Sequence, residues 1–292
     1  MILYLQVIIQ QFFGGSGADH ITVLNNSTVD AGDGADTIVA GNDAVIDAGA
    51  HRDNITAGNN ANINSGSGSD NVIAGDNATI INISGNDIIK AGDYTTFIGS
   101  DWSESIEVAN FSLLENLGGG NDTVIAKDHN TIVVDSGDNN ISIGSSNELL
   151  LSGGSNVAEL SNGYASSNNK ITASGTTQVY VSAYAANSNN IQTGASDDTF
   201  EINTYSIHSF SSNIVNLGDG NNTIISSSTT AFNNNSFITG SGDDVVNLGN
   251  SSVTHINDSS KNNYFNFGDG NNNVTLGFNK TSGNKIITGS GK

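Results

Sequence analysis

The sequence of 292 residues contains no cysteine and no proline. Without cysteine the chain can form neither disulfides nor thiolate metal sites, and it has no cysteine nucleophile. The absence of proline fits long strand ladders, in which a proline would remove an N–H donor. Basic residues are also scarce, since 8 Lys and Arg stand against 29 Asp and Glu, giving a formal net charge of −21. This balance argues against nucleic acid, which is bound by basic patches, and against anionic lipid.

Long apolar runs are missing as well. The most apolar stretch, residues 1–13, is too short to cross a bilayer as a helix. It also lacks the basic start and the small-residue cleavage site of a signal peptide. Because Ile, Val, Leu, Tyr and Phe dominate this stretch, we expect an N-terminal strand or cap. No segment of the sequence predicts a membrane span.

A 17-residue repeat organises the first half of the chain. An acidic residue recurs at this spacing, and an aliphatic residue follows it two positions later. The acidic column is Asp19, Asp36, Asp53, Asp70, Asp87 and Glu104, and a second aliphatic column is Val29, Ile46, Ile63, Ile80, Phe97 and Leu114. Each unit holds two short alternating stretches bounded by Gly, Asn or Asp, a pattern typical of strands between tight turns.

Seventeen residues are too few for a repeat that contains a helix. The pattern therefore predicts an all-β protein, a parallel β-roll or β-solenoid in which each coil supplies two strands and two turns. Equivalent residues of successive coils would lie about 4.8 Å apart, as in any parallel ladder. The aliphatic columns would form a thin core between the strands, and stability would accumulate along the stack.

The spacing divides the chain into four segments. Residues 1–13 form the cap, residues 14–140 carry regular repeats of 17–18 residues, residues 141–212 are an irregular Asn- and Ser-rich part of the solenoid, and residues 213–292 form longer coils. Because the last turn ends at Lys292 with no polar cap after it, we expect a truncated array.

Glycine-rich turns of the form Gly-x-Gly-x-Asp-x-aliphatic carry the acidic residues. They occur at residues 15–21, 32–38, 66–72, 118–124 and 240–246. The motif resembles the calcium-binding nonapeptide of the RTX (hemolysin-type) family, Gly-Gly-x-Gly-x-Asp-x-U-x, which forms a parallel β-roll. The resemblance covers the regular half of the chain well and the last part of it incompletely.

The resemblance implies calcium ions between equivalent turns of successive coils, held by turn carbonyls and Asp carboxylates. The implied site residues are Gly15, Gly17, Asp19, Gly32, Gly34, Asp36, Asp53, Gly66, Gly68, Asp70, Asp87, Gly118, Gly120, Asp122, Gly240, Gly242 and Asp244. Electrostatics favours a cation independently of the resemblance. Carboxylates stacked about 5 Å apart repel by about 3 kcal/mol per pair at an effective dielectric near 20, and no basic column neutralises them.

Several departures from the family pattern limit where calcium is expected. The third turn, Gly49 to Asp53, lacks its second glycine and carries His51 and Arg52, while turns 218–222 and 268–272 have Asn at the key position. The opposite turns, such as residues 25–26 and 42–43, lack paired glycines. We therefore predict calcium on one edge, an Asn ladder on the other, and weak or empty sites where Asn replaces Asp.

The function that the resemblance implies is the calcium-binding repeat region of a secreted or cell-surface bacterial protein, adhesin- or toxin-like, which folds outside the cell. Its partners would be calcium ions and a cell-surface glycan or protein. One alternative is a metal-independent adhesive or structural solenoid, in which each Asp caps its own turn and binds nothing. A polysaccharide-modifying β-helix enzyme would need acids beside basic residues along one face. The eight basic residues are scattered, so we predict no enzyme.

Overall fold

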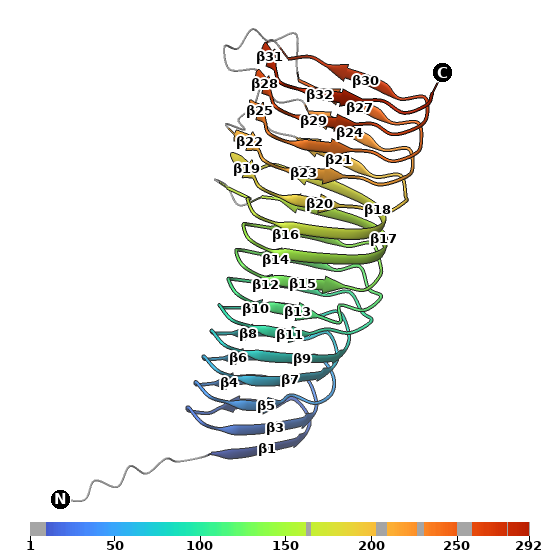
Figure 1. Cartoon of the computed structure of the whole chain (residues 1–292). Helices are drawn as coiled ribbons and strands as arrows, with labels where there is room; N and C mark the ends of the chain where they lie inside the picture. The colour runs from blue at the N-terminus through green and yellow to red at the C-terminus, as the bar shows by residue number, and fades with distance from the viewer. Residues whose placement is uncertain are drawn as a thin grey trace, which may run out of the picture. The chain divides into compact units, whose positions relative to one another are not determined.

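The computed structural model describes residues 10–161, 165–202, 209–226, 231–249, 259–278 and 280–291. In these residues the regular structure consists of β-strands, and none of them forms a helix able to cross a membrane. The chain divides into two units, residues 1–125 and 126–292. Each unit is a parallel β-solenoid (Figure 1), which confirms the fold class predicted from the repeat.

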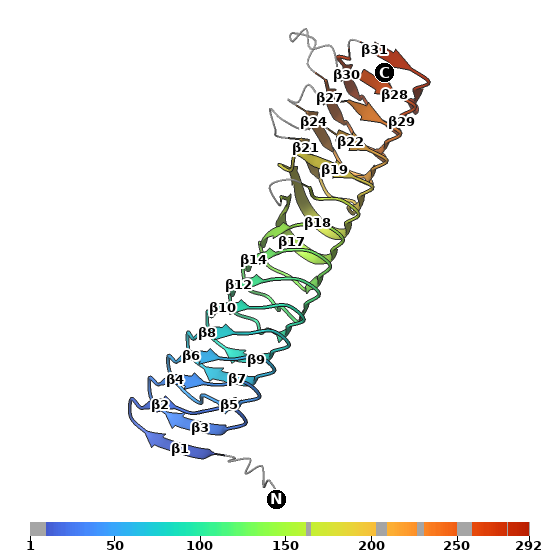
Figure 2. The same ribbon diagram turned by 90° about the vertical axis from the view of Figure 1, so that its left-hand side faces the viewer.

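The first unit stacks coils that contribute two strands each. One row of strands is β2 (His20–Thr22), β4 (Thr37–Ala40), β6 (Asn54–Ala57), β8 (Asn71–Ala74), β10 (Ile88–Ala91) and β12 (Ser105–Val108). The facing row is β1 (Gln11–Ser16), β3 (Thr28–Asp33), β5 (Val45–Asp47), β7 (Asn62–Ser67), β9 (Thr79–Ser84), β11 (Thr96–Ile98) and β13 (Leu113–Glu115). Figure 2 shows β4, β6 and β8 in one row and β5, β7 and β9 in the other.

The register of the first unit is the 17-residue repeat itself. Ile38 pairs with Ile55 between β4 and β6, and Ile46 pairs with Ile63 between β5 and β7. Because the shift is constant, each side chain lies above its own copy. The N-terminal strand predicted for residues 1–13 is described only from residue 10 onward, where β1 begins at Gln11; residues 1–9 lie outside the described residues.

Strand alternation places both aliphatic columns in the core of the first unit. The residues at most 2% exposed are Ile21, Ile38, Ile55, Val72, Ile89 and Ile106 in one row, and Val29, Ile46, Ile63, Ile80, Phe97 and Leu114 in the other. Each such side chain contributes about 1.5–3 kcal/mol when it is removed from water. The intervening residues point outward, as the period of two requires.

The second unit has longer coils and adds a third row of strands that the sequence did not predict. One row is β16 (Asn140–Ile143), β21 (Thr199–Ile202), β24 (Thr223–Ser226), β27 (Val245–Leu248) and β30 (Asn273–Leu276). A second is β15 (Thr131–Val134), β20 (Asn190–Gln192), β23 (Ile214–Asn216), β26 (Ser236–Ile238), β29 (Tyr264–Asn266) and β32 (Lys285–Ile287). The third, seen along one edge in Figure 1, is β19 (Ala185–Asn187), β22 (Ser209–Ser211), β25 (Phe232–Asn233), β28 (Ser259–Lys261) and β31 (Lys280–Ser282).

Two long strands, β17 (Glu148–Leu160) and β18 (Lys170–Val181), lie in the segment predicted to be irregular. They pair in parallel along almost their whole length, with one register shift between Ser152 and Ser155. Each contributes to two rows, since β17 pairs with both β15 and β16. The spacing that varies in the sequence therefore comes from the connections, and the paired strands keep their register. β14 (Thr123–Ala126) is the remaining strand of the described residues.

Aromatic side chains fill the wider core of the second unit. Phe200, Phe210 and Phe237 come from three different rows, and their ring centroids lie 6.0 to 6.4 Å apart. All three are at most 1% exposed. A coil with three strands encloses a larger cross-section than a coil with two, so it needs bulkier side chains to reach normal packing density.

Truncating a core column should destabilise the first unit strongly. Ile63→Ala truncates a fully buried side chain, so we expect the free energy of unfolding to fall by about 2–5 kcal/mol. The measurement is urea unfolding of the full chain followed by the fluorescence of Trp102, the sole tryptophan. Thr56→Ala, at an exposed position of β6, is the control and should change stability by less than about 0.5 kcal/mol. Equal effects of the two changes would contradict the assigned core.

Candidate metal-binding edge

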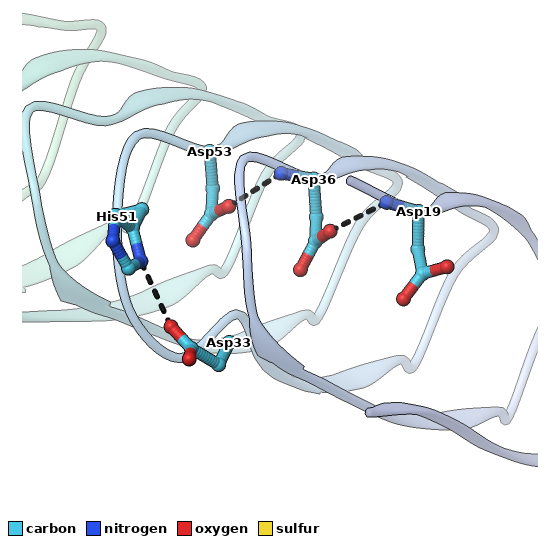
Figure 3. A network of polar contacts seen from close by, with 5 residues as sticks. All are labelled: Asp19, Asp33, Asp36, His51 and Asp53. Carbon is cyan, nitrogen blue, oxygen red and sulfur yellow. Dashed lines mark hydrogen bonds and ion pairs between the residues drawn. The ribbon is translucent and has the colours of Figure 1, made fainter. Parts of the chain in front are cut away.

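The acidic residues of the repeat form a hydrogen-bonded column along the glycine-rich turns of the first unit. The backbone N–H of Asp19 donates to Oδ1 of Asp36 at 2.7 Å, and that of Asp36 donates to Oδ1 of Asp53 at 2.8 Å (Figure 3). The same bond joins Asp53 to Asp70 at 2.8 Å and Asp70 to Asp87 at 2.6 Å. These bonds of the carboxylates run between coils, which differs from a turn in which each Asp caps its own backbone.

The second oxygen of each of these carboxylates is buried without a donor. Asp36, Asp53, Asp70 and Asp87 are at most 1% exposed. Oδ2 of each, and Oδ2 of Asp19, has no hydrogen-bond partner among the described residues. A buried carboxylate oxygen without a partner is costly, because it has lost its water and gained nothing in exchange. Each coil of the column therefore contains a buried carboxylate oxygen with no partner, and a bound proton or cation would stabilise it.

Burial is also the main cause of the raised pKa values in this column. It raises the pKa of Asp53 and of Asp87 to about 7, and it raises the pKa of Asp70. For Asp53 the hydrogen bond from the Asp36 N–H opposes the shift, while the carboxylates of Asp70 and Asp36 add to it. Desolvation and repulsion between stacked carboxylates thus both disfavour the ionised column in the absence of a cation.

Glu104 continues the column with different partners. Its N–H donates to Oδ1 of Asp122 at 2.9 Å, while its Oε1 accepts from Nδ2 of Asn82 and from Oγ of Ser100, each at 2.9 Å. Burial is the first cause that raises the pKa of Glu104 to about 9. Asn82 was not predicted as a partner of Glu104. It continues the 17-residue column of Ala31, Ala48 and Ser65, and the change from small residues to an amide in that column was the signal for it.

The predicted glycines allow the turns to stack closely. Gly15, Gly17, Gly32 and Gly66 have φ values of 101°, 105°, 97° and 85°, which disfavour other residues. A β-carbon on Gly32 or Gly34 would collide with the carbonyl oxygen of Gly15 or Gly17, respectively. Equivalent collisions are found at Gly66, Gly68, Gly118, Gly120, Gly240 and Gly242. Glycine is therefore favoured at these positions, because the carbonyl oxygens of one turn face the backbone of the next.

The third turn keeps its shape although it lacks the second glycine. His51 occupies that position with φ of 79°, and its Nδ1 lies 2.9 Å from Oδ1 of Asp33, both side chains being 67% exposed (Figure 3). Asp53 still takes its place in the buried column. The departure from the motif is thus absorbed by a strained histidine at the surface, and the column continues through it.

In the second unit the same column position carries mainly Asn. Asn222 accepts the N–H of Asp198 at 3.0 Å through Oδ1. Its Nδ2 donates to the carbonyl oxygens of Gly218 and Gly220, both at 3.1 Å. Asp198 and Asp244, by contrast, each have a buried Oδ2 that lacks a partner among the described residues, and burial raises their pKa values. The coil of the predicted site residues Gly240, Gly242 and Asp244 therefore lies between coils that carry Asn at the column position, Asn222 and Asn272.

The opposite edge of the first unit carries the predicted Asn ladder. The N–H of Asn42 donates to Oδ1 of Asn25 at 2.8 Å, and that of Asn59 donates to Oδ1 of Asn42 at 2.9 Å. Asp76, Asp93 and Asn110 extend the series with bonds of 2.9 to 3.0 Å. The next residue of each turn, such as Asn26 at φ 58°, adopts the left-handed conformation. The predicted Asn ladder is therefore present on this edge, with Asp at two of its positions.

A second buried Asn column in the second unit was missed by the sequence analysis. Its members are Asn130, Asn147, Asn169, Asn189, Asn213, Asn235, Asn263 and Asn284, of which all but Asn284 are buried. The N–H of each member before Asn284 donates to Oδ1 of the next. Their spacings vary, which hid the column. The signal was the recurrent pattern of Asn, any residue and then an apolar residue, as in residues 147–149 and 213–215.

The described residues contain no group of three or more His, Cys, Asp or Glu side chains placed to hold a metal by themselves. An ion on the Asp edge would therefore need backbone carbonyls for most of its ligands. Ca²⁺ accepts such a set, because it takes 6–8 oxygen ligands in flexible geometry. The donors that the turns supply, carbonyl and carboxylate oxygens, are of the required chemical type.

Comparison of the chain with models of known protein families, with curated proteins and with solved structures finds no match. The geometry of the two edges is therefore what bears on the function.

Acid should stabilise the first unit when divalent ions are chelated. The folded pKa values of Asp53 and Asp87 lie above the value of about 4 expected in the unfolded chain. The contribution of these two carboxyl groups to folding stability is therefore fully present below pH about 4 and is lost as the pH rises through about 7. We expect a higher urea midpoint at pH 5 than at pH 8 in chelator, measured by Trp102 fluorescence.

A matched pair of variants separates this effect from the net charge of the chain. Asp53→Asn removes a buried carboxylate and should reduce the difference between pH 5 and pH 8. Asp47→Asn removes an exposed one and should leave most of the difference in place. The pH argument fails if the two variants behave alike.

Proposed function

We propose that the first unit is a calcium-binding repeat module whose glycine-rich edge holds Ca²⁺ and folds when calcium is present. The observation that carries the proposal is the row of five buried Oδ2 atoms, those of Asp19, Asp36, Asp53, Asp70 and Asp87, which lack donors in successive coils. A dication beside them would remove both the desolvation cost and the repulsion between stacked carboxylates. The motif resemblance supports the same ion.

Each part of the turn has a role in this proposal. The Oδ1 atoms remain bonded to the backbone of the preceding coil, so the Oδ2 atoms would be the carboxylate ligands. Carbonyl oxygens of turn residues such as Gly15 and Gly17 would supply the neutral ligands. The residues Gly118, Gly120 and Asp122 would form a further site, and Gly240, Gly242 and Asp244 an isolated weaker one.

Linkage would make calcium a folding switch. An ion that binds only the folded coils stabilises them by mass action. Without the ion, the acidic column and the net charge of −21 favour the open chain. Such a switch suits a secreted or cell-surface protein, adhesin- or toxin-like, that meets a high calcium concentration outside the cell. The proposal includes no catalytic residues.

A metal-independent adhesive or structural solenoid is the second candidate. It is favoured by the continuous hydrogen bonds of the column, which join coils through Oδ1 with no metal. Outward-facing apolar side chains such as Val39 and Ile73, 40% and 44% exposed, would contribute to contact with a glycan or another surface. Calcium dependence of folding separates the two candidates.

The first experiment is a calcium titration of the chelated full chain followed by far-UV circular dichroism, with magnesium as the control ion. We expect β-structure to increase with calcium and to respond weakly to magnesium, because Mg²⁺ requires a smaller octahedral site. Full β-structure in chelator, unchanged by calcium, would contradict the calcium proposal and favour the metal-independent solenoid.

Removing two column carboxylates should weaken the response. Asp36→Ala with Asp70→Ala should raise the calcium concentration at the midpoint by about 10- to 100-fold, since an interaction with a charged group is worth about 1.5–3 kcal/mol. Asp30→Ala, at an exposed outward position of β3, is the control and should leave the midpoint nearly unchanged. A larger effect of the Asp30 variant would be incompatible with the proposed site.

A further inference from the structure

One column position carries two kinds of side chain in the two units. In the first unit it carries acids in every coil from Asp19 onward. In the second unit four of the seven described members of the column are amides, namely Asn139, Asn156, Asn222 and Asn272, and the other three are Thr177, Asp198 and Asp244. Asp and Asn have nearly the same shape, so the difference between the units is one of charge and hydrogen-bond donors.

The amide donates where the carboxylate cannot. Asn222 follows Gly218 and Gly220 at the same spacing at which Asp36 follows Gly32 and Gly34. Both side chains accept a backbone N–H from the preceding coil through Oδ1. The remaining atom of Asn222, Nδ2, donates to two turn carbonyls, while the remaining atom of Asp36, Oδ2, has no partner among the described residues.

The same arrangement is found in the other Asn coils. Nδ2 of Asn139 donates to the carbonyl oxygens of Ser136 and Gly137 at 3.1 Å each. Nδ2 of Asn156 donates to Gly153 O at 2.6 Å, and Nδ2 of Asn272 donates to Phe267 O at 2.7 Å. In every case the donor turns toward carbonyl oxygens of its own turn, which is where a bridging cation would lie in an Asp coil.

The second Asn column of this unit strengthens the contrast. Asn213 is buried, its Nδ2 donates to Ala186 O at 2.9 Å, and its Oδ1 accepts the N–H of Asn189 at 2.9 Å. Asn235 and Asn263 donate to Phe210 O and Phe232 O in the same way. The corresponding column of the first unit has no Asn and consists of Ser27, Ala44, Ala61, Ala78, Thr95 and Ser112. The polar groups inside the second unit are therefore largely satisfied by neutral amides.

We propose that the column Asn amides of the second unit take the place of calcium, so that this unit keeps its fold without the ion while the first unit requires it. The inference rests on the proposed function for the calcium dependence of the first unit. For the second unit it rests on the hydrogen bonds of the amides. Calcium would then control one part of a chain whose other part is already folded.

Hydrogen exchange of the full chain, analysed by peptide in chelator and in excess calcium, tests the proposal. At about 100 times the dissociation constant, one bound ion should slow exchange in the first unit by about 100-fold. Peptides of the second unit should be protected in both conditions and should change far less. Loss of protection in both units in chelator, with recovery of both in calcium, would overturn the inference and leave the proposed function standing. Full protection of both units in chelator would overturn the proposed function itself.

Replacing a column Asn by Asp tests the role of the amide directly. Asn222→Asp keeps the Oδ1 acceptor and removes the donor, so exchange around β24 and β27 should accelerate in chelator and slow again in calcium. Asn221→Asp is the matched control, because Asn221 is exposed and acts as an acceptor for the N–H of Asp243. Equal behaviour of the two variants would overturn the role assigned to the amide.

The reverse change gives an effect of opposite sign that a simple failure to fold cannot imitate. Asp36→Asn supplies the missing donor in a turn with the glycines of turn 218–222. We expect exchange in the first unit to be slower than in the wild-type chain in chelator, with a smaller response to calcium. Faster exchange in chelator would contradict the proposal.

Discussion

The hydrogen bond between a turn side chain of one coil and the backbone N–H of the neighbouring coil is the constraint on which the two edges depend. Strand pairing fixes the distance between coils, and a short side-chain acceptor then joins each turn to the next. Asp36 and Asp53 do this on the glycine-rich edge, Asn25 and Asn42 on the opposite edge, and Asn213 inside the second unit. Asp and Asn, whose acceptors are close to the backbone, fill most of these positions, and Glu104 is an exception on the glycine-rich edge.

This constraint explains why charge accumulates in the first unit. Either Asp or Asn can supply Oδ1, but Asp brings a second oxygen that must also be buried. The 17-residue repeat places such an oxygen in coil after coil, and burial raises the pKa of Asp53 and of Asp87 to about 7. A structural device that needed only an acceptor would be served better by Asn, and the opposite edge of the same coils shows that Asn fits such a ladder. The retention of carboxylates is therefore a cost that a bound cation would offset.

The fold of the first unit could be predicted from the sequence because its period is constant. Ile38, Ile55 and Val72 recur at the same 17-residue spacing as Asp36, Asp53 and Asp70. One alignment of the repeats therefore predicts the core, the turns and the stacking of the coils together. In the second unit the connections vary in length, and strands as short as Phe232–Asn233 leave no periodic signal. The third row and the column from Asn130 to Asn284 were therefore not predicted, although a search for Asn two residues before an apolar residue would have found the column.

The candidate site was predictable in position but not in its chemistry. The motif identifies which glycines and acids share one edge, and on that edge the acids are joined from coil to coil by hydrogen bonds. The sequence cannot show that Oδ1 of each Asp is already used by the backbone, which leaves Oδ2 as the atom that lacks a partner. Nor can it show that Nδ2 of Asn222 contacts the carbonyls of Gly218 and Gly220. Replacing Asp by Asn at this position thus exchanges an oxygen that lacks a hydrogen-bond partner for a donor that finds carbonyl oxygens in its own turn, and the proposed role of calcium depends on this difference.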